Sequence, residues 1–445
     1  MSRTTSADPM LDRAALLDRF ERVRRRSREL FDLLSEEAYY ERPIALRNPI
    51  VFYEGHLAAF SVNTLLKKAL GQPGIDPALE TLFARGIDPE QELPDASARA
   101  IWPDRSRVRA YVEAADERLR EALRSAELSR PGHPLLDRAE AVFAVLEHEE
   151  MHQETLQYIW HRLPFDQKRP PASTKPIADG AVPAPEMVSV PAGVATLGAE
   201  RTRVPFGWDN EFGEHRVEVP AFRVDRYDVT NAEFLAFVED GGYRRDALWS
   251  AEAWTWRAKE RVEHPLFWER HDGTWYWRAM FELVRLPLAW PVYVSHAEAE
   301  AFARWRGCRL LTEPEFHRAA YGEPAGTERR HPWGDEAPSA AHGNFDARHW
   351  DPVPVGTHPR GASAFGVDDL VGNGWEWTST PFRPFPGFRP MPSYPEYSAD
   401  FFDDRHYVLK GASPATAAAH VRRSFRNWFR PHYPYVYATF RCASD

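Results

Sequence analysis

Cysteine is almost absent from this chain, in which Cys308 and Cys442 are the only two among 445 residues. So few thiols exclude a disulfide framework and a thiolate-rich metal site, and they fit a reducing compartment. Any metal ion that the chain binds must therefore be held by nitrogen and oxygen ligands.

Long apolar runs are missing as well. No segment is apolar over the roughly 18 residues that a membrane-spanning helix needs, and the N-terminal residues lack the apolar core of a signal peptide. An excess of positive charge is also missing, since the formal net charge is -10 at pH 7. We therefore expect a cytoplasmic protein with no membrane partner and no nucleic-acid partner.

The chain is 43% hydrophobic, and its two halves follow different patterns. Residues 1–165 contain four segments whose apolar side chains recur at helical spacing. These segments span residues 11–34, 48–70, 105–126 and 135–163. Four such helices predict an antiparallel bundle, a scaffold whose interior commonly holds metal sites.

A change in composition follows the bundle. Residues 166–185 are rich in proline, alanine and polar residues and lack periodicity, which predicts a linker. Residues 186–445 hold most of the 16 tryptophans, together with short alternating segments typical of strands and helices that end at glycine. This second half predicts an irregular α+β domain.

Two histidines on the fourth expected helix, His148 and His152, are four residues apart and so point to the same side. His56 is the best third ligand, because it is the only histidine of the earlier helices and lies in an apolar stretch. Three imidazoles would leave coordination positions open for a substrate or dioxygen. Spacing alone leaves a structural role equally open, with His56 as a core histidine and the acidic residues beside the pair on a solvated face.

The same helix also matches the zinc-protease motif H-E-x-x-H, with Glu149 in the place of the general base. The third ligand of such proteases lies downstream, where this chain offers His161. The helical half supplies no partner for an active-site cleft. A zinc protease is therefore the less favoured interpretation.

Four segments of the second half carry specific motifs. They are residues 290–320 with RLLTE, 331–335 with HPWGD, 363–382 with GNGWEW, and the closing residues 407–445. These motifs resemble the formylglycine-generating-enzyme-like, or sulfatase-modifying-factor, domain, an α+β fold of the C-type-lectin kind. The formylglycine-generating activity itself is not expected, because its paired cysteine would stand five residues before Cys442, where this chain has Tyr437.

A helical bundle that carries FYEGH and HEEMHQE, followed by such a domain, resembles the DinB-like sulfoxide synthases of ergothioneine and ovothiol biosynthesis. In that family, His56, His148 and His152 match the three ligands of a non-haem iron(II). The resemblance implies a dioxygen-dependent bond between the sulfur of cysteine and the imidazole of trimethylhistidine, giving the sulfoxide precursor of ergothioneine. The segments LRNPIVFYEGH and LFARGIDPE look closer to the ovothiol branch.

The resemblance also assigns residues to the substrates. Asn427 and Trp428, in the segment RNWF, match the pair that holds the trimethylated amine, Trp428 by cation–π attraction. Phe429 stands where relatives that use γ-glutamylcysteine carry an aspartate, which favours free cysteine as the thiol donor. Met151 replaces a glutamine of the same relatives, so the imidazole must be held differently.

Three roles have more candidates than the sequence can separate. The catalytic proton donor is a tyrosine, with Tyr394 and Tyr397 as candidates. The candidates for the carboxylate of cysteine are the guanidinium groups of Arg105, Arg107, Arg426 and Arg430. The candidates for orienting a ligating imidazole are Glu54, Glu149 and Glu154.

Other functions remain open at this stage. Within the same chemistry, the chain could act on unmethylated histidine, as the ovothiol-type enzymes do, or on a selenium compound. Against the ovothiol type, the chain ends at FRCASD without the methyltransferase that such enzymes often carry. A non-catalytic ligand-binding module is the alternative from another class, and it would be favoured if the three histidines did not converge.

Overall fold

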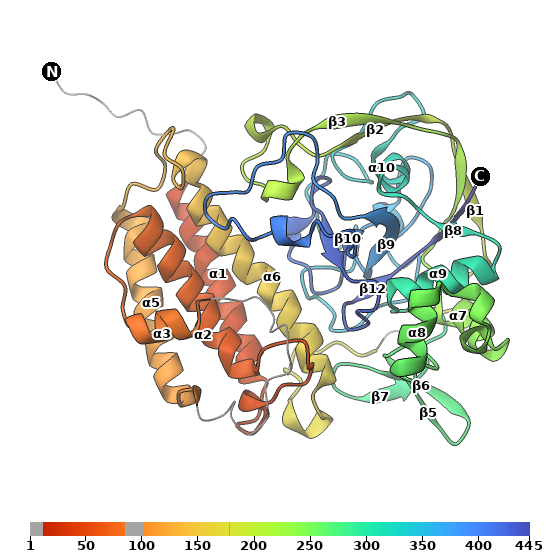
Figure 1. Ribbon diagram of the computed structural model, residues 1–445, viewed down its shortest axis with the longest axis horizontal. Coiled ribbons are helices and arrows are strands. Elements are labelled where there is room, and N and C mark those ends of the chain that lie inside the picture. The colour runs from red at the N-terminus through yellow and green to blue at the C-terminus, as the bar shows by residue number, and fades with distance from the viewer. Residues whose placement is uncertain (1–11, 85–100, 178) are drawn as a thin grey trace. The chain divides into compact units, whose positions relative to one another are not determined.

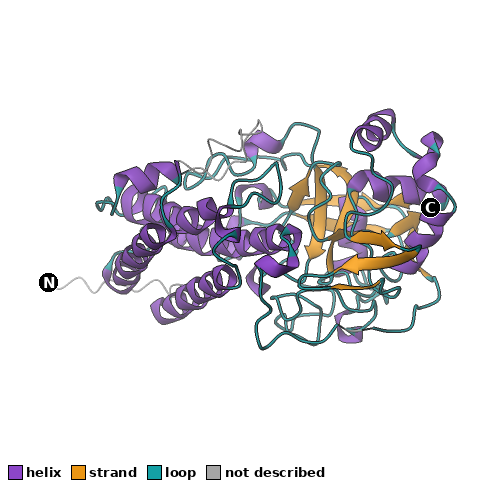
Figure 2. Ribbon diagram, turned by 90° about the horizontal axis from the view of Figure 1, so that it is seen from below, coloured by secondary structure: helices purple, strands orange, loops and turns teal. Residues whose placement is uncertain are grey.

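The chain folds into two compact units in a computed structural model that describes residues 12–84, 101–177 and 179–445 (Figure 1). One unit is helical and comprises Met1–Pro171 together with Met391–Pro395. The other comprises Ala172–Pro390 and Glu396–Asp445 and contains the strands (Figure 2). The expected fold class is confirmed, and the change of unit at residue 171 falls inside the expected linker. The return of Met391–Pro395 to the helical unit was not expected.

The helical unit is a bundle of four main helices, α1, α2, α5 and α6, which pack against one another. The α-helices among its described residues are α1 (Arg13–Asp32), α2 (Ile50–Ser61), α3 (Pro77–Leu82), α5 (Arg105–Ser125) and α6 (Glu140–Arg162). A π-helical segment, η2 (Val62–Ala69), continues α2. The described residues of this unit also form three short 3₁₀ segments: η1 (Ala38–Tyr40), η3 (Asp137–Ala139) and η4 (Phe165–Gln167).

Burial distinguishes α2 and α6 from the other helices of the bundle. Every residue of α2 is buried, because its sequence IVFYEGHLAAFS is apolar on nearly all sides. Helix α6 buries charged and polar side chains along with its apolar ones, among them Glu147, Glu149, Glu150 and Gln153. Buried charges are rare unless they are paired, so α6 indicates a functional interior.

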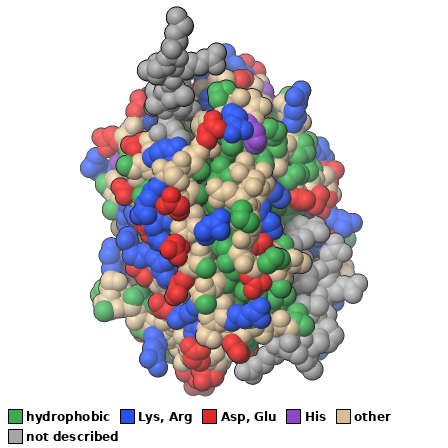
Figure 3. Space-filling model, turned by 90° about the vertical axis from the view of Figure 1, so that its left-hand side faces the viewer, with side chains coloured by type: hydrophobic (Ala, Val, Ile, Leu, Met, Phe, Trp, Pro, Cys, Tyr) green, Lys and Arg blue, Asp and Glu red, His purple; other side chains and the backbone are tan. Residues whose placement is uncertain are grey.

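The surface of the helical unit carries basic and acidic side chains next to one another (Figure 3). Ion pairs join α1 to α5 on this unit: Arg120 lies 2.5 Å from Glu21, and Arg109 lies 2.8 Å from Asp32. These two arginines of α5 are therefore paired with carboxylates of α1. No helix among the residues described in the structure is long and apolar enough to cross a membrane.

The second unit contains two four-stranded sheets and two smaller ones. The first sheet has the order β1 (Met187–Val190), β4 (Phe222–Asp225), β13 (Cys442–Ser444), β8 (Arg309–Leu310). The second has the order β11 (Asn427–Phe429), β10 (Tyr407–Ala412), β9 (Gly374–Pro381), β12 (Ala438–Thr439). The smaller sheets are β2 (Gly193–Leu197) with β3 (His215–Val219), and β5 (Trp268–His271), β6 (Thr274–Arg278), β7 (Leu283–Arg285). All pairings are antiparallel except that of β12 with β9.

Helices α7 (Asn231–Glu239), α8 (Ala251–Lys259), α9 (His296–Trp305) and α10 (Glu313–Tyr321) accompany these sheets. Three of them, α7, α9 and α10, begin at a capping box. In this motif the N-cap hydroxyl accepts a hydrogen bond from the backbone N–H of a glutamate three residues later, and that glutamate's carboxylate accepts one from the N-cap backbone N–H. The T-E-P-E part of the RLLTEPEF motif is such a box, formed by Thr312 and Glu315 at the start of α10. The motif is therefore first of all a helix-start signal.

A buried ion cluster explains two other motifs of this unit. Arg441, which is 1% exposed, donates two hydrogen bonds to Glu376 at 2.7 and 2.8 Å and one to Asp228 at 3.1 Å. Glu376 is the central residue of the WEW motif on β9, and Arg441 immediately precedes β13. The paired guanidinium therefore ties the closing segment of the chain to the second sheet.

Candidate metal centre

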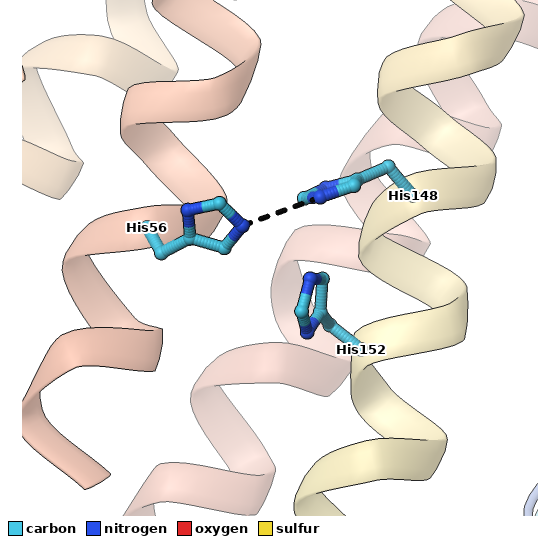
Figure 4. Close-up of side chains that lie close together, drawn as sticks. All are labelled: His56, His148 and His152. Carbon is cyan, nitrogen blue, oxygen red and sulfur yellow. Dashed lines mark hydrogen bonds between the residues drawn. The ribbon is translucent and has the colours of Figure 1, made fainter. Parts of the chain in front are cut away.

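The three histidines converge in the interior of the helical unit (Figure 4). His56 comes from α2, and His148 and His152 come from successive turns of α6. One ring nitrogen of each lies within 4.8 Å of those of the others, and Nε2 of His56 lies 3.3 Å from Nε2 of His148. Within the described residues, no other three histidines, cysteines or carboxylates gather in this way. The histidines therefore converge, and non-convergence was the condition that would have favoured a non-catalytic ligand-binding module.

Hydrogen bonding and burial prepare these rings to act as ligands. Nδ1 of His56 donates to the carbonyl oxygen of Phe83 at 2.8 Å, which leaves the lone pair of Nε2 directed at His148. Burial lowers the pKa of His56 to about 4 and the pKa values of His148 and His152 well below their ordinary range. All three are therefore neutral imidazoles near neutral pH, the form that binds metal ions.

Two nitrogen atoms of the site lack the hydrogen-bond partners that buried polar atoms usually have. Nδ1 of His148 and Nδ1 of His152 are buried and have no hydrogen-bond partner in the structure. Leaving such groups unsatisfied is costly, and a bound metal ion with its water ligands is one way to satisfy a site of this kind. The donor set, three neutral nitrogens without a thiolate, fits a divalent transition metal ion such as iron(II).

Aromatic side chains enclose the trio and hold the rings in place. Phe60 stacks on His148 with ring centroids 3.6 Å apart, and Phe52 stacks on His56 at 5.0 Å. Gly55 explains the glycine of the motif FYEGH, because a Cβ at this position would lie 2.4 Å from the ring of Phe83. The missing side chain lets Phe83 pack against α2, where its carbonyl accepts the hydrogen bond from His56.

A buried arginine joins the helices that carry the histidines. Arg24 of α1 lies 2.7 Å from the carboxylate of Glu149 on α6 and 3.0 Å from that of Asp116 on α5. It also donates to Oγ of Ser61 at the end of α2, at 3.0 Å. Ser27 donates a further hydrogen bond to Glu149 at 2.6 Å. One guanidinium thus contacts all the other main helices of the bundle.

These contacts bear on the proposed roles of the carboxylates. Glu149 is held by Arg24 and Ser27, so the position of a protease general base is taken by an ion pair. Glu54 accepts a hydrogen bond from the hydroxyl of Tyr39 at 2.5 Å and lies 3.5 Å from Arg109. Glu154 is buried on α6. The zinc-protease interpretation loses its catalytic base.

The structure separates the two candidate tyrosines. Tyr394 belongs to Met391–Pro395 of the helical unit, and its ring centroid lies 5.3 Å from that of Phe60 and 6.1 Å from that of His148. The neighbouring Ser393 donates to Glu140 of α6 at 3.1 Å. Tyr397 belongs to the second unit. Of the two, Tyr394 is the tyrosine that lies beside the histidines.

In the second unit, Trp428 lies within an aromatic cluster. Its ring stacks on Phe382 with centroids 4.3 Å apart, and Tyr397 meets it edge-on at 5.2 Å. Tyr397 itself stacks on Trp208 at 4.1 Å. Such a cluster fixes the orientation of the indole ring and so suits the recognition of a cation.

The neighbours of Trp428 on β11 are arranged as follows. Oδ1 of Asn427 accepts a hydrogen bond from the backbone N–H of Trp428 at 2.9 Å. Phe429 stacks on Tyr433 with ring centroids 5.1 Å apart. This position therefore carries an aromatic ring in place of the aspartate that the γ-glutamylcysteine type has there. Met151 lies half-buried on α6, immediately before His152.

The candidate arginines differ in what they contact. Arg426 is buried and donates to both carboxylate oxygens of Glu313, at 2.9 and 3.1 Å. This pairing supports the start of β11 and occupies the two N–H groups that could bind a substrate carboxylate. Arg105 contacts Glu36 and the carbonyl of Phe31. Arg107, which lies 3.4 Å from Asp76, and Arg430 are exposed. Substrate binding by Arg426 stays a prediction, and sequence alone did not reveal its partner Glu313.

Replacing Arg24 by methionine should destabilise the helical unit by about 3 kcal/mol, because Glu149 would remain buried without its cation and Asp116 would keep only the half-exposed Arg28. Urea unfolding followed by the helical signal in circular dichroism measures this change. The matched control is Arg25→Met, one residue further along α1, whose ion pair with Glu29 is exposed and should contribute less than about 1 kcal/mol. Equal losses in the two variants would show that the buried ion pairs do not hold the bundle.

Two families of known domains match this chain. Residues 19–156 match the DinB superfamily, and residues 173–445 match the sulfatase-modifying factor enzyme 1-like domain. The first match includes all three histidines, and the second includes Tyr394 and β11. Among solved structures, PvdO from Pseudomonas aeruginosa is similar over 58% of this chain and 94% of its own, with 23% identity and a TM-score of 0.41.

Curated relatives match across both domains. The chain is 37% identical over 416 residues to the hercynine oxygenase of Mycobacterium tuberculosis, a match that covers 90% of this chain and 92% of that protein. It is 46% identical over 256 residues to the hercynine oxygenase of Mycolicibacterium thermoresistibile, covering 56% of each chain. The placement nearer to the ovothiol branch stays a prediction, and most of the segment LFARGIDPE lies outside the described residues. The chain belongs to the hercynine oxygenase family of ergothioneine sulfoxide synthases.

Proposed function

We propose that this protein is an iron(II)-dependent oxygenase that joins the sulfur of cysteine to the imidazole of trimethylhistidine and forms a sulfoxide. The observation that carries the proposal is the convergence of His56, His148 and His152 in one buried site of a chain whose relatives are hercynine oxygenases. Dioxygen is the co-substrate of such an oxygenase. Its organic substrates are small molecules.

The three imidazoles are the proposed metal ligands. An iron(II) ion bound by them would supply the activation of dioxygen and a binding position for the thiol sulfur. Three neutral ligands leave the charge of the ion uncompensated, which favours binding of a thiolate over a thiol. The stacked rings of Phe52 and Phe60 exclude water from the sides of the ligands that they cover.

Tyr394 is the proposed proton donor. Its ring lies beside His148 in the same compact unit, and the Ser393–Glu140 hydrogen bond holds its segment on α6. The hydroxyl of a phenol still carries its proton at neutral pH, because its ordinary pKa lies near 10. It therefore has a proton to donate. Tyr397, which packs between Trp208 and Trp428, is proposed to shape the aromatic cluster instead.

Residues of β11 are proposed to select the substrates. Trp428 would attract the trimethylammonium group through its π face, while Phe382 supports the ring from behind. Phe429 offers no negative charge for a second amino group, which favours free cysteine over γ-glutamylcysteine. The related reactions on unmethylated histidine or on a selenium compound remain alternatives within the same chemistry.

Removal of one histidine tests the metal site. The His152→Ala variant should bind iron(II) far more weakly than the wild type. Removing a residue that only hydrogen-bonds to a metal ligand typically lowers metal affinity about 10–100-fold, and loss of a ligand itself should lower it further. Anaerobic titration with iron(II) measures the affinity and the stoichiometry. The control His271→Ala alters a half-exposed histidine of the second unit and should bind like the wild type. Equal, weak binding by all three proteins would favour the non-catalytic binding module.

Removal of one hydroxyl tests the proton donor. Tyr394→Phe keeps the ring against Phe60 and His148, so iron binding should be unchanged. Its turnover number for the sulfoxide product should fall about 100-fold or more, as expected for loss of a positioned proton donor. Quantifying that product by mass spectrometry gives the rate, with Tyr276→Phe on β6 as the control. A wild-type turnover number in Tyr394→Phe would exclude Tyr394 from this role.

Oxygen consumption identifies the substrates when cysteine or γ-glutamylcysteine is paired with histidine or trimethylhistidine. Cysteine with trimethylhistidine should react fastest, and faster turnover with γ-glutamylcysteine would overturn the inference from Phe429. In Trp428→Ala, the KM for trimethylhistidine should rise about tenfold, in line with loss of about 1–2 kcal/mol of cation–π attraction. The KM for cysteine should stay near the wild-type value. Comparable increases in both would contradict a cation–π role.

A further inference from the structure

The only two cysteines of the chain lie next to each other in the second unit. Strands β8 and β13 pair antiparallel, with Cys442 opposite Leu310 and Ala443 opposite Arg309. Paired residues point to the same face of a sheet, and so do residues two apart on one strand. Cys308, two residues before Leu310, therefore faces the same side as Cys442, and the two cysteines are diagonal neighbours across the strand pair.

The surroundings of the two sulfur atoms differ. Cys308 is partly exposed, whereas Cys442 is fully buried. The nearby thiol of Cys442, together with the positive charge of Arg306, lowers the pKa of Cys308 to about 6. The same contact and burial raise the pKa of Cys442. An accessible thiolate beside a buried thiol is the arrangement of an attacking cysteine and its resolving partner.

We propose that Cys308 and Cys442 form a reversible intramolecular disulfide, with a low-molecular-weight disulfide as the oxidant. The thiolate of Cys308 attacks one sulfur of the oxidant, forming a mixed disulfide and releasing one small thiolate. Cys442 then loses its proton and attacks the sulfur of Cys308, which releases the second small thiolate. The protein loses two electrons and two protons, and the oxidant is reduced to two thiols.

The position of this disulfide predicts its structural effect. It would link β13, the last strand of the chain, to β8, which leads directly into α10. Glu313, at the start of α10, accepts two hydrogen bonds from Arg426. Arg426 immediately precedes β11, so this contact also positions the beginning of that strand. A covalent link between residues so far apart in sequence restricts the unfolded chain and should stabilise the first sheet.

The test uses the full chain, reduced and then incubated with oxidised glutathione in the absence of iron and substrates. After denaturation in urea, the number of thiols that react with a chromogenic disulfide reagent should fall from two to none, with no glutathione retained in the intact mass. Peptide mapping should recover a Cys308–Cys442 cross-link. The melting temperature should rise by about 5 °C and return to its starting value after reduction with dithiothreitol.

Two single variants assign the roles of the cysteines. Cys442→Ala should keep one bound glutathione on Cys308, because no partner resolves the mixed disulfide. Cys308→Ser should react with oxidised glutathione at least tenfold more slowly than the wild type, since its remaining thiol is buried. In the wild type, two free thiols, a stable glutathione adduct or a disulfide-linked dimer would each overturn the proposal. None of these readouts depends on iron binding or oxygenase activity.

Discussion

The geometry of the candidate metal centre depends on one buried guanidinium. Arg24 of α1 makes ion pairs with carboxylates of α5 and α6 and a hydrogen bond to the end of α2. Apolar packing would hold four helices together with some freedom of rotation, whereas a guanidinium satisfies its partners in only a narrow range of orientations. Since His56 comes from α2 and the other two histidines from α6, the same contacts that fix these helices also fix the distances between the ring nitrogens.

Burial then sets the chemical state of the site that Arg24 helps to build. The aromatic rings around the histidines lower the pKa values of the imidazoles, so that their lone pairs are free near neutral pH. The positive charge of Arg24 is balanced by Glu149, which is adjacent in sequence to His148 but has its partners on α1. The network thus supplies rigidity without placing the carboxylate of Glu149 among the candidate ligands, and a metal ion held by the three imidazoles would keep positions open for other ligands.

Sequence predicted those features that depend on local spacing. The i, i+4 separation of His148 and His152 determines that both rings share one face of α6, and the capping box of α10 can be read from T-E-P-E. Contacts between distant segments gave no such signal. The pairing of Arg426 with Glu313, and that of β8 with β13, which brings the two cysteines together, depend on sheet topology that periodicity cannot specify. His56 was chosen because few histidines competed for the role, and Tyr394 could not be separated from Tyr397.

The position of Tyr394 gives a physical reason for the fusion of the two domains. Its segment lies within the sequence of the sulfatase-modifying factor enzyme 1-like domain, yet it packs with the helical unit through Ser393 and Glu140. A DinB-type bundle alone would hold the three histidines but would lack the tyrosine beside His148. The second domain therefore contributes more than its own fold, because it returns a short piece of chain that completes the surroundings of the candidate metal ligands. Separate chains would have to order that segment at an additional entropic cost, which a covalent connection within one folded domain reduces.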